Sequence, residues 1–243
     1  MRFTFTLFIV TGLLSNIYSQ PSEFNQAWID TSKAIILDPY QGNEMDWKKI
    51  ATDKRVVAII HKATQGSKVD KKYIIRKKIA KENGYKWGSY HLGKPGDPVK
   101  QADFYLQTVG INDDEVYALD LEDLDAKYSM PLDSATKFIN RIFEKTGRFP
   151  FIYCNWVVLN GISSKFDSNS VFAKCHLWHA RFRKKIPNFN TKVWKKYTIW
   201  QFSCELNCNE KGDCPYRVPG TNSFMDINVY NGTISELRMK WPN

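Results

Sequence analysis

The sequence predicts an α/β protein, an irregular (β/α)8-type (TIM-like) barrel with degraded helices in its second half. Eight apolar, β-prone segments follow one another along the chain, and amphipathic helical stretches separate several of them. Acids or aromatic residues lie at or near the ends of most of these segments. Because the active sites of such barrels lie at the C-terminal ends of the strands, this third observation predicts a functional rim.

The predicted elements cover most of the chain. We place the strands at residues 34–38, 55–64, 86–91, 116–122, 149–155, 176–182, 197–203 and 224–230, and helices at 70–83, 97–110 and 133–146. A short helical segment begins at residues 45–47. The helix at 133–146 has the clearest pattern, because Ala135, Phe138, Ile139, Ile142 and Phe143 form one stripe before Gly147. The connection before the last strand is a cysteine-rich loop rather than a helix.

The N-terminus has the pattern of a secretory signal. Met1-Arg2 precedes an apolar run from Phe3 to Leu14, which is short for a membrane helix. We expect cleavage after Ser19, so residues 1–19 form the signal peptide and residues 20–243 a single barrel domain. The protein is then secreted and extracellular, or luminal in a digestive vacuole, with no stable membrane insertion.

The net charge of +10 favours an anionic partner, although solubility explains it equally well. Basic residues are spread through 68–81 and 181–196, and no nucleic-acid-binding motif accompanies them, so we expect no nucleic-acid partner. We expect a monomer.

Five cysteines follow the predicted signal, which favours disulfides. Cys204, Cys208 and Cys214 lie in one loop, where a single bridge would close the loop. Zinc is the competing interpretation, but no Cys-x-x-Cys or suitably spaced histidine pair is present, so we expect no metal and no cofactor. Cys154, inside an apolar strand, is the best candidate for a buried free thiol.

Asp120 and Glu122 are the first candidate catalytic residues. Side chains at i and i+2 of a strand point to the same face, so these two carboxyls would lie side by side. Two close carboxylates suppress each other's ionisation, which lets one act as a general acid while the other stays charged. The alternative is an acidic strand end that leads into a solvated loop, since Asp123 and Asp125 follow.

Other polar and aromatic side chains are predicted at the same rim. Asp38 and Asp226 belong to the first and last strands, and the candidate substrate-binding residues are Gln65, Tyr90, Tyr153, Trp178, Trp200 and Gln201. Aromatic faces stack on sugar rings and acids cleave glycosidic bonds, so the set indicates a glycoside hydrolase. The aromatic residues would equally fill a barrel interior.

The chain resembles the family 25 glycoside hydrolases, the Chalaropsis-type lysozymes. The resemblance runs from about Ile35 to Glu236 and rests on motifs that occur in the family's order. These are Ile36-Leu37-Asp38-Pro39-Tyr40-Gln41-Gly42 with Asp46-Trp47, Lys62-Ala63-Thr64-Gln65-Gly66, Gly88-Ser89-Tyr90-His91, Leu119-Asp120-Leu121-Glu122, Ile152-Tyr153, Leu177-Trp178-His179-Ala180-Arg181, Trp200-Gln201-Phe202-Ser203 and Asp226-Ile227-Asn228-Val229-Tyr230-Asn231-Gly232.

This resemblance implies an irregular β/α barrel that cleaves the β-1,4 bond between N-acetylmuramic acid and N-acetylglucosamine in bacterial cell-wall peptidoglycan. Glu122 would protonate the leaving oxygen, and Asp120 would orient the 2-acetamido group. Asp38 and Asp226 would position the substrate and tune the pair. Attack by the acetamido carbonyl and attack by an activated water both stay open.

Two departures from the family pattern stand out. Gln65 occupies a position where the family usually has Glu, and we expect the loss of that acid to alter the pH optimum. The 204–214 loop is longer and richer in cysteine than the usual connection.

Two other functions compete with a muramidase. A chitinase-like hydrolase is disfavoured because Asp113, Asp114 and Glu115 precede the acidic strand at the wrong spacing. A catalytically degenerate glycan-binding protein is favoured by Gln65 but disfavoured by the retention of the other four acids.

Overall fold

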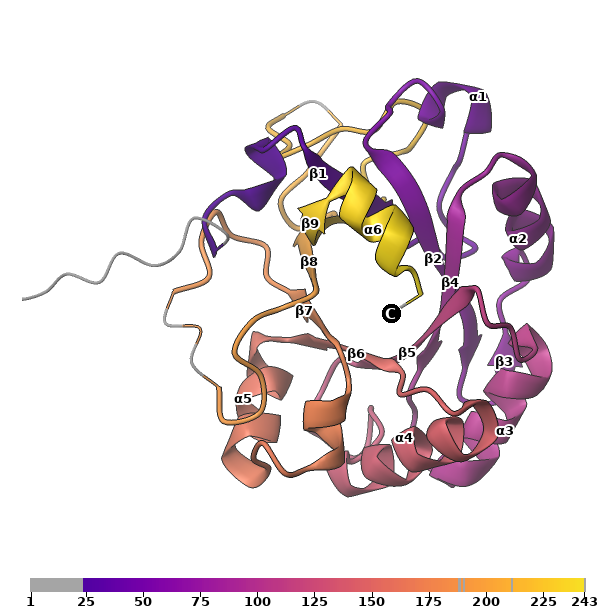
Figure 1. Cartoon of the computed structure of the whole chain (residues 1–243), viewed down its shortest axis with the longest axis vertical. Helices are drawn as coiled ribbons and strands as arrows, with labels where there is room; N and C mark the ends of the chain where they lie inside the picture. Colours follow the sequence, from indigo (N-terminus) through magenta and orange to yellow (C-terminus); the bar gives the residue numbers. More distant parts are fainter. Residues whose placement is uncertain (1–23, 188, 190, 211, 243) are drawn as a thin grey trace, which may run out of the picture.

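The computed structural model describes residues 24–187, 189, 191–210 and 212–242, and the predicted signal peptide and its cleavage site lie outside this part of the chain. Eight strands of the described chain close a barrel (Figure 1), which confirms the predicted fold class. They are β1 (Lys33–Leu37), β2 (Val56–Gln65), β4 (Lys86–Leu92), β5 (Glu115–Leu121), β6 (Phe151–Asn155), β7 (Leu177–Ala180), β8 (Ile199–Ser203) and β9 (Ile227–Thr233).

One barrel strand runs against the others. The order is β1-β9-β8-β7-β6-β5-β4-β2, and a β1–β2 pairing closes the ring. Neighbouring strands pair in parallel except at β9, which is antiparallel to both β8 and β1. The short β3 (Lys68–Val69) only extends the end of β2 as a hairpin. Because β9 is reversed, its first residues lie at the end of the barrel where the other strands finish.

Helices cover one side of the barrel (Figure 1). They are α1 (Trp47–Ile50), α2 (Tyr73–Glu82), α3 (Pro98–Val109), α4 (Leu132–Thr146) and α5 (Trp156–Lys165), with single 3-10 turns at Ala27–Ile29 and Val171–Lys174. In the described chain, no α-helix follows β7 or β8, as the degraded second half predicts. The helix α5 was not predicted, although Asn155 caps it by accepting hydrogen bonds from the backbone N–H groups of Val157 and Val158.

Helix α4 shows how the sequence pattern positions a helix. Asp133 lies in its first turn, where a carboxylate stabilises the helix dipole, and Gly147 follows its last residue at a φ of +70°. Phe138 and Ile142 are fully buried against the barrel, and each contributes roughly 2–3 kcal/mol. The predicted fifth member of the stripe was wrong as a core residue, since Phe143 is 41% exposed and stacks on Phe149 instead.

The barrel has an inner and an outer apolar layer because side chains alternate along each strand. Small and branched residues such as Ala58, Ala118 and Ile60 pack inside, while the outer faces of the strands pack against the helices. The last helix, α6 (Ile234–Lys240), places Leu237 in the inner layer. Trp241 donates a 3.0 Å hydrogen bond to the carbonyl of Trp87, the second residue of β4, so α6 covers the N-terminal end of the barrel.

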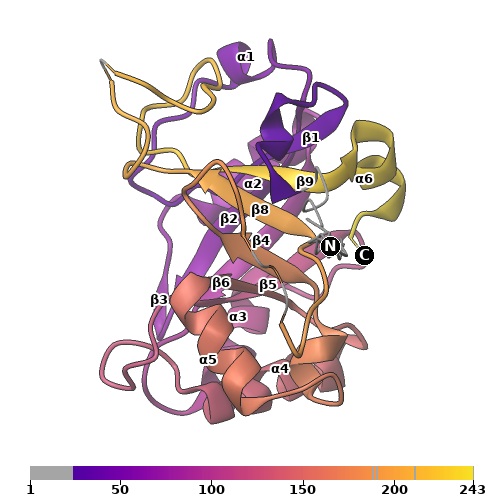
Figure 2. The ribbon, with the colours of Figure 1, turned by 90° about the vertical axis from the view of Figure 1, so that its left-hand side faces the viewer.

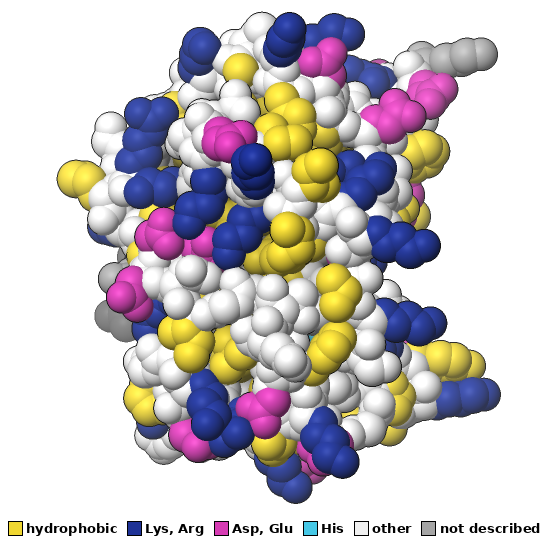
Figure 3. All heavy atoms as spheres, turned by 90° about the vertical axis from the view of Figure 1, so that its right-hand side faces the viewer, with side chains coloured by type: hydrophobic (Ala, Val, Ile, Leu, Met, Phe, Trp, Pro, Cys, Tyr) yellow, Lys and Arg dark blue, Asp and Glu magenta, His cyan; other side chains and the backbone are white. Residues whose placement is uncertain are grey.

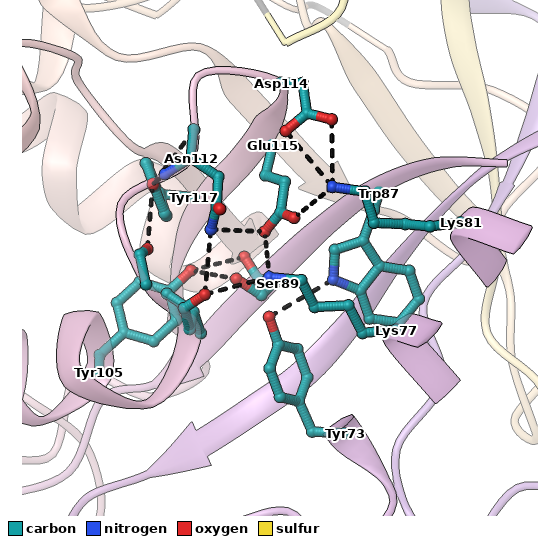
Figure 4. A network of polar contacts seen from close by, with 12 residues as sticks. Tyr73, Lys77, Lys81, Trp87, Ser89, Tyr105, Asn112, Asp114, Glu115 and Tyr117 are labelled. Carbon is teal, nitrogen blue, oxygen red and sulfur yellow. Dashed lines mark hydrogen bonds and ion pairs between the residues drawn. The ribbon is translucent and has the colours of Figure 1, made fainter. Parts of the chain in front are cut away.

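Polar contacts at this same end tie β5 to α2. The carboxylate of Glu115 is only 1% exposed, and Lys77 and Lys81 of α2 approach it to 2.8 and 2.9 Å (Figure 4). Asn112 adds a hydrogen bond to the same carboxylate. Glu115 is the first residue of β5, whereas Asp120 lies near the end of that strand. The ion pairs of Glu115 therefore hold α2 against the barrel, at the end opposite to Asp120.

Figure 2 shows that α6 and the long connection between β8 and β9 lie at opposite ends of the barrel. The face over α2 and α3 carries Lys and Arg side chains dispersed among acids and apolar groups, rather than gathered in one patch (Figure 3). The helices of the described residues are all too short or too polar to cross a membrane.

Candidate active site

A pocket of about 320 Å³ opens at the end of the barrel where the parallel strands finish. Acids from three parts of the chain meet there, as expected for residues that follow different barrel strands. The lining residues are Tyr40, Lys62, Tyr90, Leu92, Asp120, Glu122, Glu205, Phe224 and Asp226. The structure thus brings together three of the four predicted catalytic acids on one surface, with Asp38 buried behind them.

Asp120 and Glu122 both line the pocket, but they differ in their environment. Strand β5 points Val116 and Ala118 into the barrel, and the same alternation brings Asp120 inward, where it is 4% exposed. One carboxylate oxygen of Asp120, Oδ1, is buried without a hydrogen-bond partner in the described structure. Glu122 lies just beyond the strand and is exposed. Asn155 holds its backbone by donating a 2.7 Å hydrogen bond to the Glu122 carbonyl.

The buried position of Asp120 changes its protonation. Burial raises the pKa of Asp120 well above its usual range, and the neighbouring charge of Glu122 raises it further. Lys62 and Lys94 act in the opposite direction. The Asp120 carboxyl therefore retains its proton to higher pH than a solvated carboxyl would.

Asp38 is the centre of a buried hydrogen-bond chain. Its carboxylate accepts a 2.9 Å hydrogen bond from Gln201 and a short one from Asn228. Tyr153 donates a 2.6 Å hydrogen bond to the amide oxygen of Gln201, and Trp178 donates one of the same length to Asn228. Burial and the charge of Asp226 raise the pKa of Asp38, whereas the two amides lower it. Side chains of β6, β7, β8 and β9 are thereby connected by hydrogen bonds to the one carboxyl that follows β1.

Asp226 reaches the pocket because β9 is reversed. It was predicted inside the last strand, but the structure places it immediately before β9, at the rim. Its carbonyl accepts a hydrogen bond from the backbone N–H of Asp38. Burial, then the charges of Glu205 and Glu122, raise the pKa of Asp226 to about 8, and Lys62 opposes them.

The predicted substrate-binding aromatic residues occupy different positions. Tyr90 lines the pocket. Trp178 is 1% exposed and packs edge-on against Tyr90 and Tyr153, with ring centroids 6.0 and 5.0 Å away. Trp178 and Tyr153 therefore support the pocket from the barrel interior. There they also donate hydrogen bonds to the side-chain amides of Asn228 and Gln201, which bind Asp38.

Two predicted substrate-binding residues lie away from the pocket. These are Trp200 and Gln65. Adjacent residues of a strand point to opposite faces, so Trp200 points outward while Gln201 points into the barrel, and the prediction that the two share a site is wrong. Trp200 is fully buried against Trp28 and donates a hydrogen bond to the carbonyl of Arg181. Gln65 ends β2 and pairs with Lys68 in the β2–β3 hairpin, and it is not among the described residues that line the pocket.

Several pocket residues were missed from the sequence. Tyr40 and Phe224 are 39% and 53% exposed at the pocket, so their rings are available to a sugar. Tyr40 follows the first strand at the rim, a position that could have identified it, whereas Phe224 was assigned to the last strand. Asn228, which binds Asp38 behind the pocket, could also have been found, because it lies two residues after Asp226. Glu205 comes from the cysteine-rich loop, whose sequence has no periodicity that would orient a side chain.

The sequence profile described as "Glycosyl hydrolases family 25" matches residues 37–211 of the chain. The chain belongs to this glycosyl hydrolase family. The match begins one residue before Asp38 and includes Asp120 and Glu122, so the acids from β1 and β5 lie inside it. Because the members of this family are glycoside hydrolases, the chain is classed as a glycoside hydrolase.

Solved structures with the same barrel include a bacterial lysozyme from Streptomyces coelicolor, with a TM-score of 0.70 and 22% identity over 86% of this chain and 96% of that chain. A family GH25 lysozyme from Aspergillus fumigatus has a TM-score of 0.68 and 23% identity over 85% and 98% of the two chains. Among curated sequences, the uncharacterized protein YegX of Escherichia coli is 27% identical, over 80% of this chain and 68% of YegX. These identities support a shared fold.

Proposed function

We propose that this family 25 protein is a muramidase, which hydrolyses the β-1,4 bond between N-acetylmuramic acid and N-acetylglucosamine in peptidoglycan. The family assignment supports this proposal, and the structural neighbours are described as lysozymes and muramidases. The pocket supports it as well, because it combines several carboxyls with exposed aromatic rings.

The observation that carries the proposal is the contrast between Glu122 and Asp120. Glu122 is exposed at the pocket, where it can reach the oxygen of a bound glycosidic bond. Asp120 is buried with its Oδ1 unpartnered, and an unpartnered buried oxygen is costly until a donor reaches it. The N–H of a 2-acetamido group is such a donor.

In the proposed reaction, Glu122 gives its proton to the leaving glycosidic oxygen as the bond to the anomeric carbon breaks. The acetamido N–H donates to the unpartnered Oδ1 of Asp120, and this hydrogen bond favours the ionised form of a carboxyl whose pKa burial raises. The Asp120 carboxylate then stabilises the positive charge that develops as the acetamido carbonyl oxygen attacks the anomeric carbon. Water then completes the hydrolysis and restores the proton to Glu122. Asp226 lies beside Asp120 and Glu122 at the pocket, and Asp38 is buried behind it.

The test is to incubate the protein with purified peptidoglycan and, separately, with chitin, then to reduce and identify the new sugar ends. A muramidase produces N-acetylmuramic acid ends from peptidoglycan and nothing from chitin. Cleavage of chitin would instead indicate the chitinase-like alternative. Binding to peptidoglycan without any new ends would identify a glycan-binding protein that has lost catalysis.

The disulfide between Cys208 and Cys214 supports an oxidising compartment, as does the predicted signal at residues 1–19. We therefore propose a secreted, monomeric enzyme whose domain begins near residue 20. Expression of residues 1–243 in a secreting host tests this: a product that begins at Gln20 in the medium is expected, and an uncleaved intracellular chain would contradict it.

A further inference from the structure

The connection between β8 and β9 carries an acidic residue near each of its ends. It spans residues 204–226, so Glu205 is its second residue and Asp226 its last. Both side chains line the pocket. Carboxylate oxygens of the two residues and the Sγ of Cys204 all lie within 4.8 Å of one another. Glu205 is exposed, whereas Asp226 is half-buried.

The first turn of this connection is held in place by its own hydrogen bonds. The side chain of Asn207 accepts one from the N–H of Cys204 and donates one to the carbonyl of Phe202 in β8, at 3.0 and 2.9 Å. The N–H of Cys208 donates to the carbonyl of Cys204 at 3.0 Å. The Cys208–Cys214 disulfide follows directly. Glu205 is therefore presented to the pocket by an ordered turn.

We propose that Glu205 is a positioning residue of the active site, which shares one proton with Asp226 and keeps the Asp226 carboxyl able to donate a hydrogen bond to the bound sugar. This inference rests on the proposed function and extends it to a residue outside the predicted acid set. Two carboxylates this close repel each other when both are ionised, so one proton is retained between them. It stays on Asp226, because the more exposed Glu205 is better solvated as an anion.

Of the charged and titratable groups around Asp226, Glu205 is the residue whose substitution tests the proposal. The groups that act on the Asp226 carboxyl are Glu205 from the connection, Glu122 beyond β5 and Lys62 of β2, and Asp226 in turn raises the pKa of the buried Asp38. Cys204 is a further titratable neighbour, and Asp226 in turn acts on Asp120, Tyr90 and Tyr153. Burial and the charge of Glu205 are the two largest effects that raise the pKa of Asp226.

The consequence is a pH effect of defined sign. Replacing Glu205 with Gln removes a negative neighbour, so Asp226 loses its proton at lower pH. If the proton on Asp226 supports substrate binding, the alkaline limb of the activity profile moves to lower pH. Near pH 4 the two enzymes should agree, because burial raises the pKa of Asp226 in both and the Asp226 carboxyl then keeps its proton with either side chain at position 205.

The experiment compares pH–rate profiles of peptidoglycan hydrolysis for the parent, Glu205→Gln and Glu210→Gln. Glu210 is an exposed acid of the same connection, so its substitution makes the same charge change away from the pocket. We expect the alkaline limb of Glu205→Gln to shift down by about half a pH unit or more, while Glu210→Gln follows the parent. Coincident profiles of the two variants in an active enzyme would overturn the proposal.

A second readout does not need activity. Because a shared proton makes ionised Asp226 a cost to the folded state, Glu205→Gln should gain melting temperature over the parent as the pH rises from 4 to 8, and Glu210→Gln should not. A difference between parent and Glu205→Gln that stays constant over this range would also overturn the proposal. An inactive parent that shows the expected thermal effect would contradict the muramidase function alone.

Discussion

Gln201 donates a 2.9 Å hydrogen bond to the carboxylate of Asp38 in the closed interior of the barrel. The same amide accepts a hydrogen bond from Tyr153, so it cannot rotate without losing one of its two partners. A carboxyl that is 3% exposed is thus held between amide donors beneath the pocket. The barrel interior orients the acids of the rim.

Replacing Gln201 with Leu should therefore damage both folding and catalysis. The Asp38 carboxyl loses a buried donor, which we expect to cost about 1–3 kcal/mol of unfolding free energy and to lower kcat. Urea denaturation and hydrolysis rates measure the two effects. Gln107→Leu, on the exposed surface of α3, is the control. Equal stability of the two variants would show that the Asp38 hydrogen bond has no structural role.

The protonation of Asp226 predicts how stability changes with pH. Its pKa is about 8 in the folded state against 3.8 for a free carboxyl, so the folded state holds a proton that the unfolded state releases. Stability is unaffected below pH 3.8 and is lost as the pH rises toward 8.

Asp226→Asn should remove this loss, with a gain in Tm at pH 8 of about 2–4 °C per kcal/mol of relieved cost. Calorimetric scans from pH 4 to pH 9 measure it. Asp213→Asn, an exposed acid of the same connection, should melt as the parent does at each pH. A pH-independent effect of Asp226→Asn would contradict this prediction.

Buried histidines set the acid side of the stability profile. Burial lowers the pKa of His61, His91 and His179 from 6.5 to about 4. The unfolded chain therefore binds protons between pH 6.5 and pH 4 that the folded chain does not, and stability falls as the pH drops through this range. His91→Gln should flatten the fall. An unchanged slope of Tm against pH would show that His91 titrates normally in the folded state.

Glu115 is predicted to matter for stability only. Glu115→Gln leaves Lys77 and Lys81 without a buried counter-charge, but both ammonium groups can reach water, so we expect a loss of about 1–3 kcal/mol. Asp114→Asn removes a contact between Lys81 and an acid that is 66% exposed, and should cost about 0–1 kcal/mol. Specific activity at a temperature where both variants are folded should match the parent.

Two exposed rings, Tyr40 and Phe224, are expected to bind the sugar directly. Substituting either with Ala should raise KM for soluble peptidoglycan fragments about fivefold, for a lost contact on the order of 1 kcal/mol. Trp200→Phe should instead lower Tm and leave KM unchanged, because Trp200 packs outside the barrel wall. An increased KM for Trp200→Phe would place this residue back in the site.

The sequence was sufficient for the parts of the fold that depend on periodicity. Alternation along β5 predicted that Asp120 and Glu122 share one face, and both line the pocket. The predicted strand bounds agreed with the structure to within a few residues. Periodicity has no direction, however, so it could not show that β9 is reversed. It was also applied too loosely at Trp200 and Gln201, where adjacent residues were assigned to one face.

The rest of the site depends on contacts between distant segments. Glu205 and Phe224 lie in a connection of irregular backbone, and only the tertiary structure brings them to the pocket. Asn155 carried a helix-capping signal for α5, but Gly161 and two serines weaken the helical pattern that follows. Irregular connections therefore limited the prediction more than the strands did.

The most direct test of the account is the rate of peptidoglycan hydrolysis by Glu122→Gln beside Asp123→Asn, with both variants shown to melt as the parent does. Asp123 is the next residue and is exposed, so it controls for charge and for position. We predict that Glu122→Gln loses about 100-fold or more of kcat, as expected for removal of a general acid, and that Asp123→Asn stays near the parent. Near-parental release of N-acetylmuramic acid ends by Glu122→Gln would contradict its role as the proton donor.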